Sequence, residues 1–485
     1  MKEQIKPMYQ LFQVSNQDFY VFDTYANKIK RLSKNCFHYL DKFSNETVNF
    51  FEEAERVEDP EFREFYKESL DQGLFKKFSV EKIQHPMTDL LEDVLDANIE
   101  SINLQVTQNC NLRCDYCPYT GNYYNNRKHS NKRMSFELAK KGIDFLYDHS
   151  MNCDVVNIAF YGGEPLLEFE LIKKCVEYAR KKFITKKVEF NLTSNGVLLT
   201  EEIMKYFSDN KILLTISLDG PQNIHDKSRV TANGTGSFEI IYEKLCYFKE
   251  KYLEYFNHNV SFNSVSAQDD GVIDTDLFFT DDPLFDECNV NTTFYSTNYL
   301  SDEQVFDKEA VRFRQHMEFE KYKCFLHKMK RIKTSPTRMQ LNSFHEVIRT
   351  AKLLQDYTGI PKVYHPSGPC VPGRKKLFLN VDGNFYPCER IDENSHCSVI
   401  GNIEEGLSLD QCRKLLNVGQ ITEEKCKSCW AIAHCKLCFV QADNGEELCA
   451  KNRLDHCSNI QDTVLDTFKN ICVLAKSGYH FEEDI

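Results

Sequence analysis

The chain has 485 residues, of which 41% are hydrophobic and 27% charged, a balance typical of globular proteins with about two to four domains. Its formal net charge of -13 argues against a broad nucleic-acid-binding surface, because such a surface needs clustered positive charge. The first residues lack the apolar segment of a secretory signal, and no later stretch approaches the roughly 18 apolar residues that span a bilayer. We therefore expect a cytoplasmic protein that binds neither nucleic acid nor membrane.

Residues 1–95 begin with three short strand-like runs and continue with helical patterns to about Leu95. The strand-like runs are residues 9–14, 18–23 and 27–32, with turn-like residues between them. This order of elements predicts a separate, winged-helix-like module.

Residues 98–300 alternate strand-like runs with amphipathic helical stretches. The strand-like runs are residues 102–107, 155–161, 187–194, 212–218, 259–265 and 288–295. Repeated strand–helix units predict an α/β fold with a parallel sheet whose functional loops lie at the carboxyl ends of the strands. Six strands suit a partial (β/α)6 TIM-like barrel.

The rest of the chain divides into three further parts. We expect a helical bridge over residues 301–365, a cysteine-rich domain of short strands and turns over residues 366–460, and a helical tail over residues 461–485. The chain has twenty cysteines, and a reducing compartment makes a disulfide framework improbable. Half of the cysteines stand in spacings typical of metal ligands, and we interpret most of the others as small buried hydrophobic residues.

Cys110, Cys114 and Cys117 form a Cys-x3-Cys-x2-Cys array directly after the first strand of the predicted barrel. Three thiolates can bind three irons of a [4Fe-4S] cluster and leave the fourth iron open to a small molecule. The alternative is a zinc site that a distant histidine completes.

Polar loops also follow the next three strands. Gly162, Gly163 and Glu164 stand in a Gly-Gly-Glu-Pro turn, where the glycines would let a backbone approach a ligand. Residues 193–196 and 217–229 follow the third and fourth strands, so polar groups from several strands would converge on one opening. The Gly-Gly-Glu-Pro turn could instead simply begin a helix at Pro165.

At these residues the chain resembles the radical S-adenosylmethionine (SAM) superfamily. The resemblance rests on the cysteine array, on Gly-Gly-Glu-Pro one strand later, and on Ser-Leu-Asp-Gly-Pro with the following His-Asp-x-x-Arg. It implies that the three cysteines bind a [4Fe-4S] cluster whose open iron takes the methionyl group of SAM, and that reduction releases a radical that abstracts hydrogen from a substrate. The residues it implies for SAM are Gly162, Gly163 and Glu164 at the methionyl amine, Asn195 and Ser217 at the ribose or carboxylate, and Arg229 at the methionyl carboxylate. An ordinary surface salt bridge is the alternative for Arg229.

The carboxyl-terminal cysteines resemble the SPASM domain, which carries two auxiliary clusters in radical SAM peptide-modifying enzymes. The pattern consists of Cys370, Gly383 and Cys388, then of the stretch CKSCWAIAHCKLC, then of Cys449. The resemblance implies an outer cluster on Cys426, Cys429, Cys435 and Cys449, and an inner cluster on Cys370, Cys388 and Cys438. Two residues separate Cys435 from Cys438 where the family usually has three, and zinc knuckles are the alternative for this stretch.

Two ligand positions stay open at the level of sequence. Cys397 or a cysteine of the substrate could complete the inner cluster, and Cys457 competes with Cys449 for the outer one. Spacing does not choose between these possibilities.

The amino-terminal module resembles the peptide-recognition element of enzymes that modify ribosomally made peptides, in which a leader pairs with a sheet edge. The basic residues of the third strand, residues 27–32, suit an acidic leader. A structural cap on the barrel is the alternative.

Together these features predict a radical SAM maturase that forms thioether crosslinks in a cysteine-containing precursor peptide with a leader, similar to sactipeptide and ranthipeptide maturases. The cofactors would be SAM and three [4Fe-4S] clusters, and the electron donor a flavodoxin or ferredoxin. The alternatives are carbon–carbon crosslinking, formylglycine formation on a sulfatase, and a non-enzymatic iron-sulfur electron-transfer or zinc-binding module.

Overall fold

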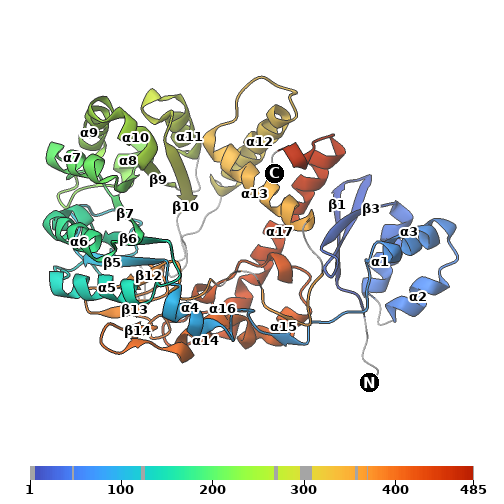
Figure 1. The fold of residues 1–485 in the computed structure, drawn as a ribbon. Coiled ribbons are helices and arrows are strands. Elements are labelled where there is room, and N and C mark those ends of the chain that lie inside the picture. The colour runs from blue at the N-terminus through green and yellow to red at the C-terminus, as the bar shows by residue number, and fades with distance from the viewer. Residues whose placement is uncertain are drawn as a thin grey trace.

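The structure is a computed structural model that describes residues 6–45, 49–121, 126–266, 271–294, 309–355, 359–366, 368 and 370–483. The chain begins with a three-stranded antiparallel sheet followed by three helices, and Figure 1 shows this module at one end of the molecule. Its elements are β1 (Tyr9–Ser15), β2 (Asp18–Asp23), β3 (Lys28–Leu32), α1 (Lys34–Asn45), α2 (Phe50–Arg56) and α3 (Pro60–Asp71). The three strands predicted for this module are confirmed.

Both faces of the amino-terminal sheet are covered. Phe19 and Val21 pack on the cluster formed with α1–α3. Phe12, Tyr20 and Phe22 point to the other face and pack against α12 (Glu309–Lys328), α13 (Arg338–Gln355) and α17 (Cys457–Lys476). The module is therefore packed firmly onto helices from the carboxyl-terminal half of the chain.

A ten-stranded sheet forms the centre of the molecule, in the order β10-β9-β8-β7-β6-β5-β12-β13-β14-β15. The first six strands in this order are parallel to their neighbours. They are β5 (Ser101–Thr107), β6 (Val155–Gly162), β7 (Lys187–Ser194), β8 (Leu213–Ser217), β9 (Val260–Ser266) and β10 (Asn289–Phe294). All six predicted strands of the α/β region are thus confirmed, and their carboxyl ends lie at one edge of the sheet.

Helices connect these parallel strands (Figure 1). They are α5 (Phe136–Asp148), α6 (Phe169–Lys182), α7 (Glu201–Asn210), α8 (Gln222–Ser228), α9 (Phe238–Lys251), α10 (Leu253–Asn259) and α11 (Gly271–Asp281). Side-chain caps fix where several begin: Ser135 accepts from Leu138 N–H, and Thr200 from Ile203 N–H. The apolar sides of α5, α6, α7 and α9 pack in one core cluster with apolar residues of the sheet.

The cysteine-rich segment extends this same sheet. β12 (Leu377–Leu379) pairs parallel to β5, and β13 (Asn384–Tyr386), β14 (Gly401–Asn402) and β15 (Gly406–Leu407) continue antiparallel. Leu377, Phe378 and Leu379 are completely buried in the core that contains β5 and β6. The segment therefore shares the hydrophobic core of the parallel sheet, although the sequence pattern presents it as a domain of its own.

Shorter elements complete the chain. They are β4 (Lys82–Ile83), paired with β11 (Val363–Tyr364), and α4 (Leu91–Ala97), α14 (Leu409–Leu416), α15 (Glu423–Lys427) and α16 (Ala450–Asp455). The predicted helical bridge corresponds to α12 and α13, and its first residues, 301–308, lie outside the described part of the chain.

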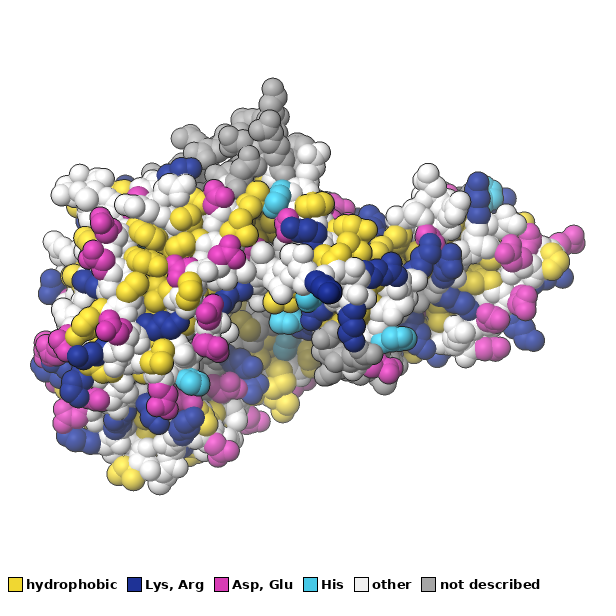
Figure 2. Space-filling view, turned by 90° about the horizontal axis from the view of Figure 1, so that it is seen from above, with side chains coloured by type: hydrophobic (Ala, Val, Ile, Leu, Met, Phe, Trp, Pro, Cys, Tyr) yellow, Lys and Arg dark blue, Asp and Glu magenta, His cyan; other side chains and the backbone are white. Residues whose placement is uncertain are grey.

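Two surface properties bear on the expected partners. Within the described ranges, no helix is both long enough and apolar enough to cross a membrane. Figure 2 shows basic and acidic side chains interspersed on the face that it presents, rather than gathered by sign.

Candidate functional site

A cavity of about 210 Å³ lies at the carboxyl ends of β5 to β8. Its walls include all nine residues predicted for the SAM site, which are Cys110, Cys114, Cys117, Gly162, Gly163, Glu164, Asn195, Ser217 and Arg229. They come from four successive strand ends, and the parallel sheet brings these ends together. The structure therefore assembles the whole predicted set in one place.

The cysteine loop is held by contacts to its own backbone and to the loop after β7. The Leu112 N–H approaches Cys110 Sγ at 3.4 Å, and the Cys117 N–H donates to the Cys114 carbonyl at 3.1 Å. Burial raises the pKa of the Cys110 thiol to about 12 and that of Cys114 to about 11. These thiols are protonated near neutral pH, so binding an iron must displace their protons.

The adjacent glycines allow two backbones to touch. A Cβ on Gly163 would lie 2.1 Å from the Asn109 carbonyl oxygen, and a Cβ on Gly162 would lie 2.0 Å from that of Thr107. The Gly163 N–H donates to Thr107 O at 2.9 Å, and the Glu164 N–H donates to Asn109 O at the same distance. The sequence suggested that these glycines admit a ligand, whereas in the structure they also seat the cysteine loop against the end of β6.

The Glu164 carboxylate is engaged by the protein. Its oxygens accept from Leu166 N–H (3.0 Å), the Ser194 hydroxyl (2.8 Å) and Asn195 N–H (2.7 Å). Burial raises its pKa to about 7, against these three hydrogen bonds, which lower it. Glu164 therefore joins the loops after β6 and β7, while it also lines the cavity.

Arg229 is buried against a carboxylate. Its Nε donates to Asp219 Oδ2 at 2.8 Å, and the Tyr116 hydroxyl donates to the same oxygen at 2.6 Å. Asp219 is fixed in turn by the Val265 N–H at 2.9 Å. The surface salt bridge considered for Arg229 is thus wrong, because only 7% of the residue is exposed.

Asn195 and Ser217 differ in how they are held. The Asn195 amide donates to Asn111 Oδ1 at 2.8 Å and lies 3.8 Å from Cys110 Sγ, so it contacts the cysteine loop directly. Ser217 ends β8 and is half-buried at the cavity wall.

Several aromatic and polar cavity residues were missed at the sequence level. They are Tyr116, Tyr119, His129 and Tyr161. Tyr116 directly precedes Cys117 and Tyr119 lies two residues after it, so their position beside the cysteine array was available as a signal. His129 had no such signal, because it reaches Cys117 Sγ (Nε2 at 3.9 Å) from a separate segment.

A larger cavity of about 800 Å³ adjoins the first one, and Tyr161 and Thr193 line both. Its wall is rich in amides and hydroxyls along one face of the strands, including Asn103, Asn157, Asn191, Thr215, Ser261 and Asn289. Parallel strands are normally apolar on both faces, so this polar face is unusual. Its sequence signal is the alternation of polar and apolar residues in β7 and β9.

The carboxyl-terminal cysteines fall into two groups. Burial raises the pKa of Cys388 to about 12, and the nearby Cys370 and Cys438 raise it further. Burial likewise raises the pKa of Cys435 to about 11, with further contributions from Cys429 and Cys426. The first group contains the three cysteines predicted for the inner set, and the second contains three of the four predicted for the outer set, without Cys449.

Cys457 lies with the outer group. Burial raises its pKa, and Cys429 and Cys426 raise it further. Gln461, one turn later on α17, donates its side-chain N–H to Cys429 Sγ at 3.5 Å. Cys449 precedes α16, and its N–H donates to Ala442 O at 2.6 Å.

Cys397 is a buried residue of the main hydrophobic core. It is 3% exposed, and its carbonyl accepts from the Gln411 side chain at 2.6 Å.

The donor set suits a cluster better than a single ion. Among the residues that the structure describes, no three or more His, Cys, Asp or Glu side chains gather tightly enough to hold one metal ion. Three thiols that line one cavity without meeting at a point fit a [4Fe-4S] cluster, in which each cysteine binds its own iron. The residues present therefore fit the cluster that the sequence predicts.

Sequence comparison finds relatives across part of the chain. The radical SAM superfamily model matches residues 104–265. Over 335 residues, 67% of this chain and 85% of the relative, the chain is 25% identical to a cysteine-type anaerobic sulfatase-maturating enzyme of Clostridium perfringens. It is 33% identical over 165 residues, 33% of this chain and 37% of the relative, to a serine-type anaerobic sulfatase-maturating enzyme of Bacteroides thetaiotaomicron. It is 25% identical over 245 residues, 48% of this chain and 50% of the relative, to the radical SAM cyclopropyl synthase TigE of Paramaledivibacter caminithermalis. The matches span 37% to 50% of the length of the first four curated relatives.

Structural comparison agrees on the fold. Native anSMEcpe with bound AdoMet matches with a TM-score of 0.54 and 22% identity, over 76% of this chain and 98% of that chain. A second anSMEcpe structure, with bound AdoMet and Cp18Cys peptide, matches with a TM-score of 0.53 and 21% identity, over 76% and 99% of the two chains. Residues 104–265 therefore match the radical SAM superfamily in sequence, and the chain is similar in fold to anSMEcpe.

Proposed function

We propose that this chain is a radical SAM maturase that forms thioether crosslinks in a cysteine-containing precursor peptide. The observation that carries the proposal is the convergence of all nine predicted residues on one cavity that adjoins a larger, amide-lined one. The peptide bound in the second anSMEcpe structure supports a peptide as the substrate.

The smaller cavity is the proposed place of SAM and its cluster. Cys110, Cys114 and Cys117 hold the cluster, and Arg229 and Asn195 contact SAM beside it. When bound, the cluster would supply the electron that reduces SAM, and SAM would supply the radical that abstracts a hydrogen atom from the substrate. The protein's part is to seat the cysteine loop, through Gly163 and Glu164, and to hold Arg229 on Asp219.

The larger cavity is the proposed place of the peptide, on the inner face of a partial (β/α)6 barrel. Asn191 donates to Asn157 Oδ1 at 3.2 Å, and Asn103 donates to Glu389 Oε2 at 3.0 Å. Side-chain amides both donate and accept, so this wall matches the alternating donors and acceptors of a peptide main chain.

The carboxyl-terminal cysteines are the proposed ligands of two auxiliary [4Fe-4S] clusters, which brings the number of clusters to three. Cys370, Cys388 and Cys438 hold the inner one, and its fourth position is left to the substrate, because Cys397 is packed in the core. Cys426, Cys429, Cys435 and Cys457 hold the outer one, with Cys457 in place of Cys449, on the strength of the Gln461–Cys429 contact.

The amino-terminal module is proposed to bind the leader along β3, an edge strand of its sheet. A groove of about 320 Å³ runs there, between β3 and the helices α13 and α17. The basic side chains of β3 do not supply the main binding energy for an acidic leader, because Lys30 already pairs with Glu68 (3.4 Å) and Arg31 with Asp18 (2.9 Å). Main-chain pairing and the apolar groove carry the recognition instead.

Replacing Cys110, Cys114 and Cys117 together with Ala tests the function. We expect the reconstituted variant to lose SAM cleavage while it keeps the iron of the auxiliary clusters, because these use separate cysteines. Coexpression with a cysteine-containing precursor peptide, sought among the open reading frames beside the gene, should yield a product lighter by two hydrogen atoms per crosslink. Retained SAM cleavage in the triple variant would contradict the assignment of the cluster.

Formylglycine formation on a sulfatase is the second candidate, favoured by the sulfatase-maturating relatives. The two functions differ in product, since formylglycine formation from cysteine removes the sulfur and leaves an aldehyde. Aldehyde labelling of a sulfatase-derived peptide after turnover would favour this candidate, whereas a thioether in the neighbouring peptide would exclude it as the main activity.

A further inference from the structure

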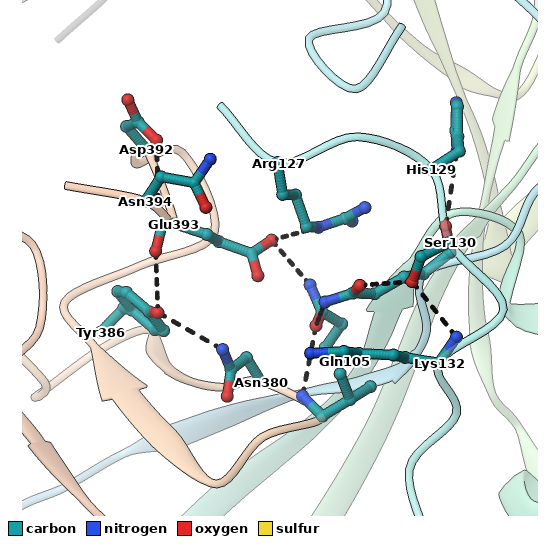
Figure 3. A network of polar contacts seen from close by, with 12 residues as sticks. Gln105, Arg127, His129, Ser130, Lys132, Asn380, Tyr386, Asp392, Glu393 and Asn394 are labelled. Atoms are coloured by element: carbon teal, nitrogen blue, oxygen red, sulfur yellow. Dashed lines mark hydrogen bonds and ion pairs between the residues drawn. The ribbon is translucent and has the colours of Figure 1, made fainter. Parts of the chain in front are cut away.

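A buried ion pair joins the radical SAM domain to the cysteine-rich segment. Arg127 Nε donates to Glu393 Oε1 at 2.6 Å, and the two side chains are only 7% and 4% exposed. Gln105, on β5, donates to the same oxygen at 2.7 Å (Figure 3). The pair therefore connects the strand that leads into the cysteine loop with the chain just after Cys388.

Among the residues that the structure describes, the far side of the Arg127 guanidinium has no hydrogen-bond partner. Its Nη1 and Nη2 are both buried, and neither finds an acceptor in that part of the chain. Figure 3 shows Arg127 meeting Glu393 through its Nε edge, with the other end of the guanidinium turned away from that carboxylate. The positive charge of Arg127 is thus compensated on one edge of the guanidinium only. Burying the other edge costs free energy, so we expect an electron-rich group beside it.

The Tyr119 ring is one electron-rich group beside the Arg127 guanidinium. The Arg127 guanidinium lies 3.6 Å from the ring centroid, within the range of a cation–π contact. Tyr119 is two residues after Cys117 and lines the cavity with it. The Tyr119 ring therefore places the positive charge of Arg127 beside the loop that carries Cys117.

We propose that the Arg127–Glu393 pair sets the reduction potential of the cluster bound by Cys110, Cys114 and Cys117. The inference rests on the proposed cluster at these three cysteines. Reduction adds one electron to the cluster, taken from the low-potential reductant, and a positive charge beside the cluster stabilises the reduced form. Net charge and hydrogen bonding around an iron-sulfur cluster are established determinants of its potential. Arg127 and Glu393 are positioning residues in this scheme, since neither lines the cavity.

Opposite charge changes in the pair should shift the potential in opposite directions. Arg127→Met leaves a carboxylate alone and lowers the potential, whereas Glu393→Gln leaves a guanidinium alone and raises it. The double variant Arg127→Met with Glu393→Gln restores neutrality and returns the potential toward the wild-type value. Arg127→Lys keeps the charge and rescues most of the shift seen with Met.

The measurement is a redox titration of the anaerobically reconstituted protein, followed by electron paramagnetic resonance. The relevant signal is the one that changes when SAM is added, because SAM is proposed to bind only the cluster held by Cys110, Cys114 and Cys117. Lys132→Met is the matched control: Lys132 pairs with Asp382 at 2.9 Å near the same network, but both side chains are about half exposed. Solvent and salt screen that charge, so its removal should leave the potential nearly unchanged.

Four results would overturn the inference. These are shifts of the same sign in the two single variants, shifts no larger than that of Lys132→Met, an unchanged potential in Glu393→Gln, and a double variant displaced as far as the Arg127→Met variant. If Arg127→Met does not load the cluster, Glu393→Gln alone decides. Wild-type protein without any SAM-responsive signal would instead refute the proposed function, and the inference with it.

Discussion

Gly163→Ala should dislodge the cysteine loop. The added Cβ would lie 2.1 Å from the Asn109 carbonyl oxygen and 2.5 Å from its carbon, both of them backbone atoms. Ordinary van der Waals contact begins at 3.4 Å, so the backbone just before Cys110 must move by roughly 1 Å. No rotamer change can relieve this contact, because the crowded atoms belong to the main chain.

The energetic effect has two parts. Overpacking against a fixed neighbour costs about 1–3 kcal/mol. The displacement also weakens the Gly163 N–H to Thr107 O and Glu164 N–H to Asn109 O hydrogen bonds, each worth about 1 kcal/mol net. We therefore expect a loss of about 2–4 kcal/mol in the free energy of unfolding of the apo protein.

Urea unfolding of apo wild type and variant measures this loss, and iron content and SAM cleavage after reconstitution report the state of the loop. Gly142→Ala is the control, since its Cβ would crowd only side-chain ends, Leu379 Cδ2 at 2.6 Å and Leu104 Cδ2 at 3.1 Å, which can shift, and Ala favours the α5 helix by up to about 1 kcal/mol. A Gly163→Ala variant as stable as Gly142→Ala, with full SAM cleavage, would refute the argument that these glycines seat the loop.

Two further predictions concern the carboxyl-terminal segment. Cys457→Ala should lower the iron content by up to one cluster, while Cys449→Ala should leave it near the wild-type value. Iron analysis and auxiliary-cluster spectra measure both. Iron lost in Cys449→Ala but kept in Cys457→Ala would restore Cys449 as the ligand. Burial raises the pKa of Asp392 from 3.8 to about 7, so the folded state holds its proton more tightly and the contribution of Asp392 to stability falls as pH rises from about 4 to about 7. Asp392→Asn keeps an acceptor for the Asn394 N–H (2.9 Å), so in urea unfolding it should gain stability relative to wild type as pH rises over that interval. A constant difference in the free energy of unfolding between the two proteins across the interval would contradict the raised pKa.

The sequence was sufficient to predict the parallel strands and the cavity that they form. β7 was predicted with its observed bounds, because its apolar residues alternate with polar ones between two clear helical patterns. Convergence of Cys110, Gly163, Asn195 and Ser217 followed from one rule, namely that the carboxyl ends of adjacent parallel strands meet.

Contacts between distant segments were beyond the reach of sequence patterns. Arg127 and Glu393 are 266 positions apart, and neither stands in a motif. The pairing of β12 with β5 has the same character, since three residues of apolar strand carry no information about their partner. The sequence of β2, DFYVFD, did carry a signal of this kind, because its four central residues are apolar without alternation. Such a strand is expected to be covered on both faces, and all six residues of β2 are buried in the structure.

The choice between Cys449 and Cys457 shows why spacing could not decide a ligand. Both cysteines stand in one short stretch, with α16 between them, so each satisfies a rule that counts residues. The helix separates them in space: Cys457 begins α17, and Gln461 on the next turn of that helix contacts Cys429 Sγ. Buried Arg453 holds this arrangement, because its guanidinium donates to the carbonyls of Leu437 and Cys438, both at 3.3 Å. Arg453 lies on α16, shortly before Cys457 of the outer set, and contacts the backbone of Cys438 of the inner set. We therefore expect a displacement at one proposed cluster to move the other.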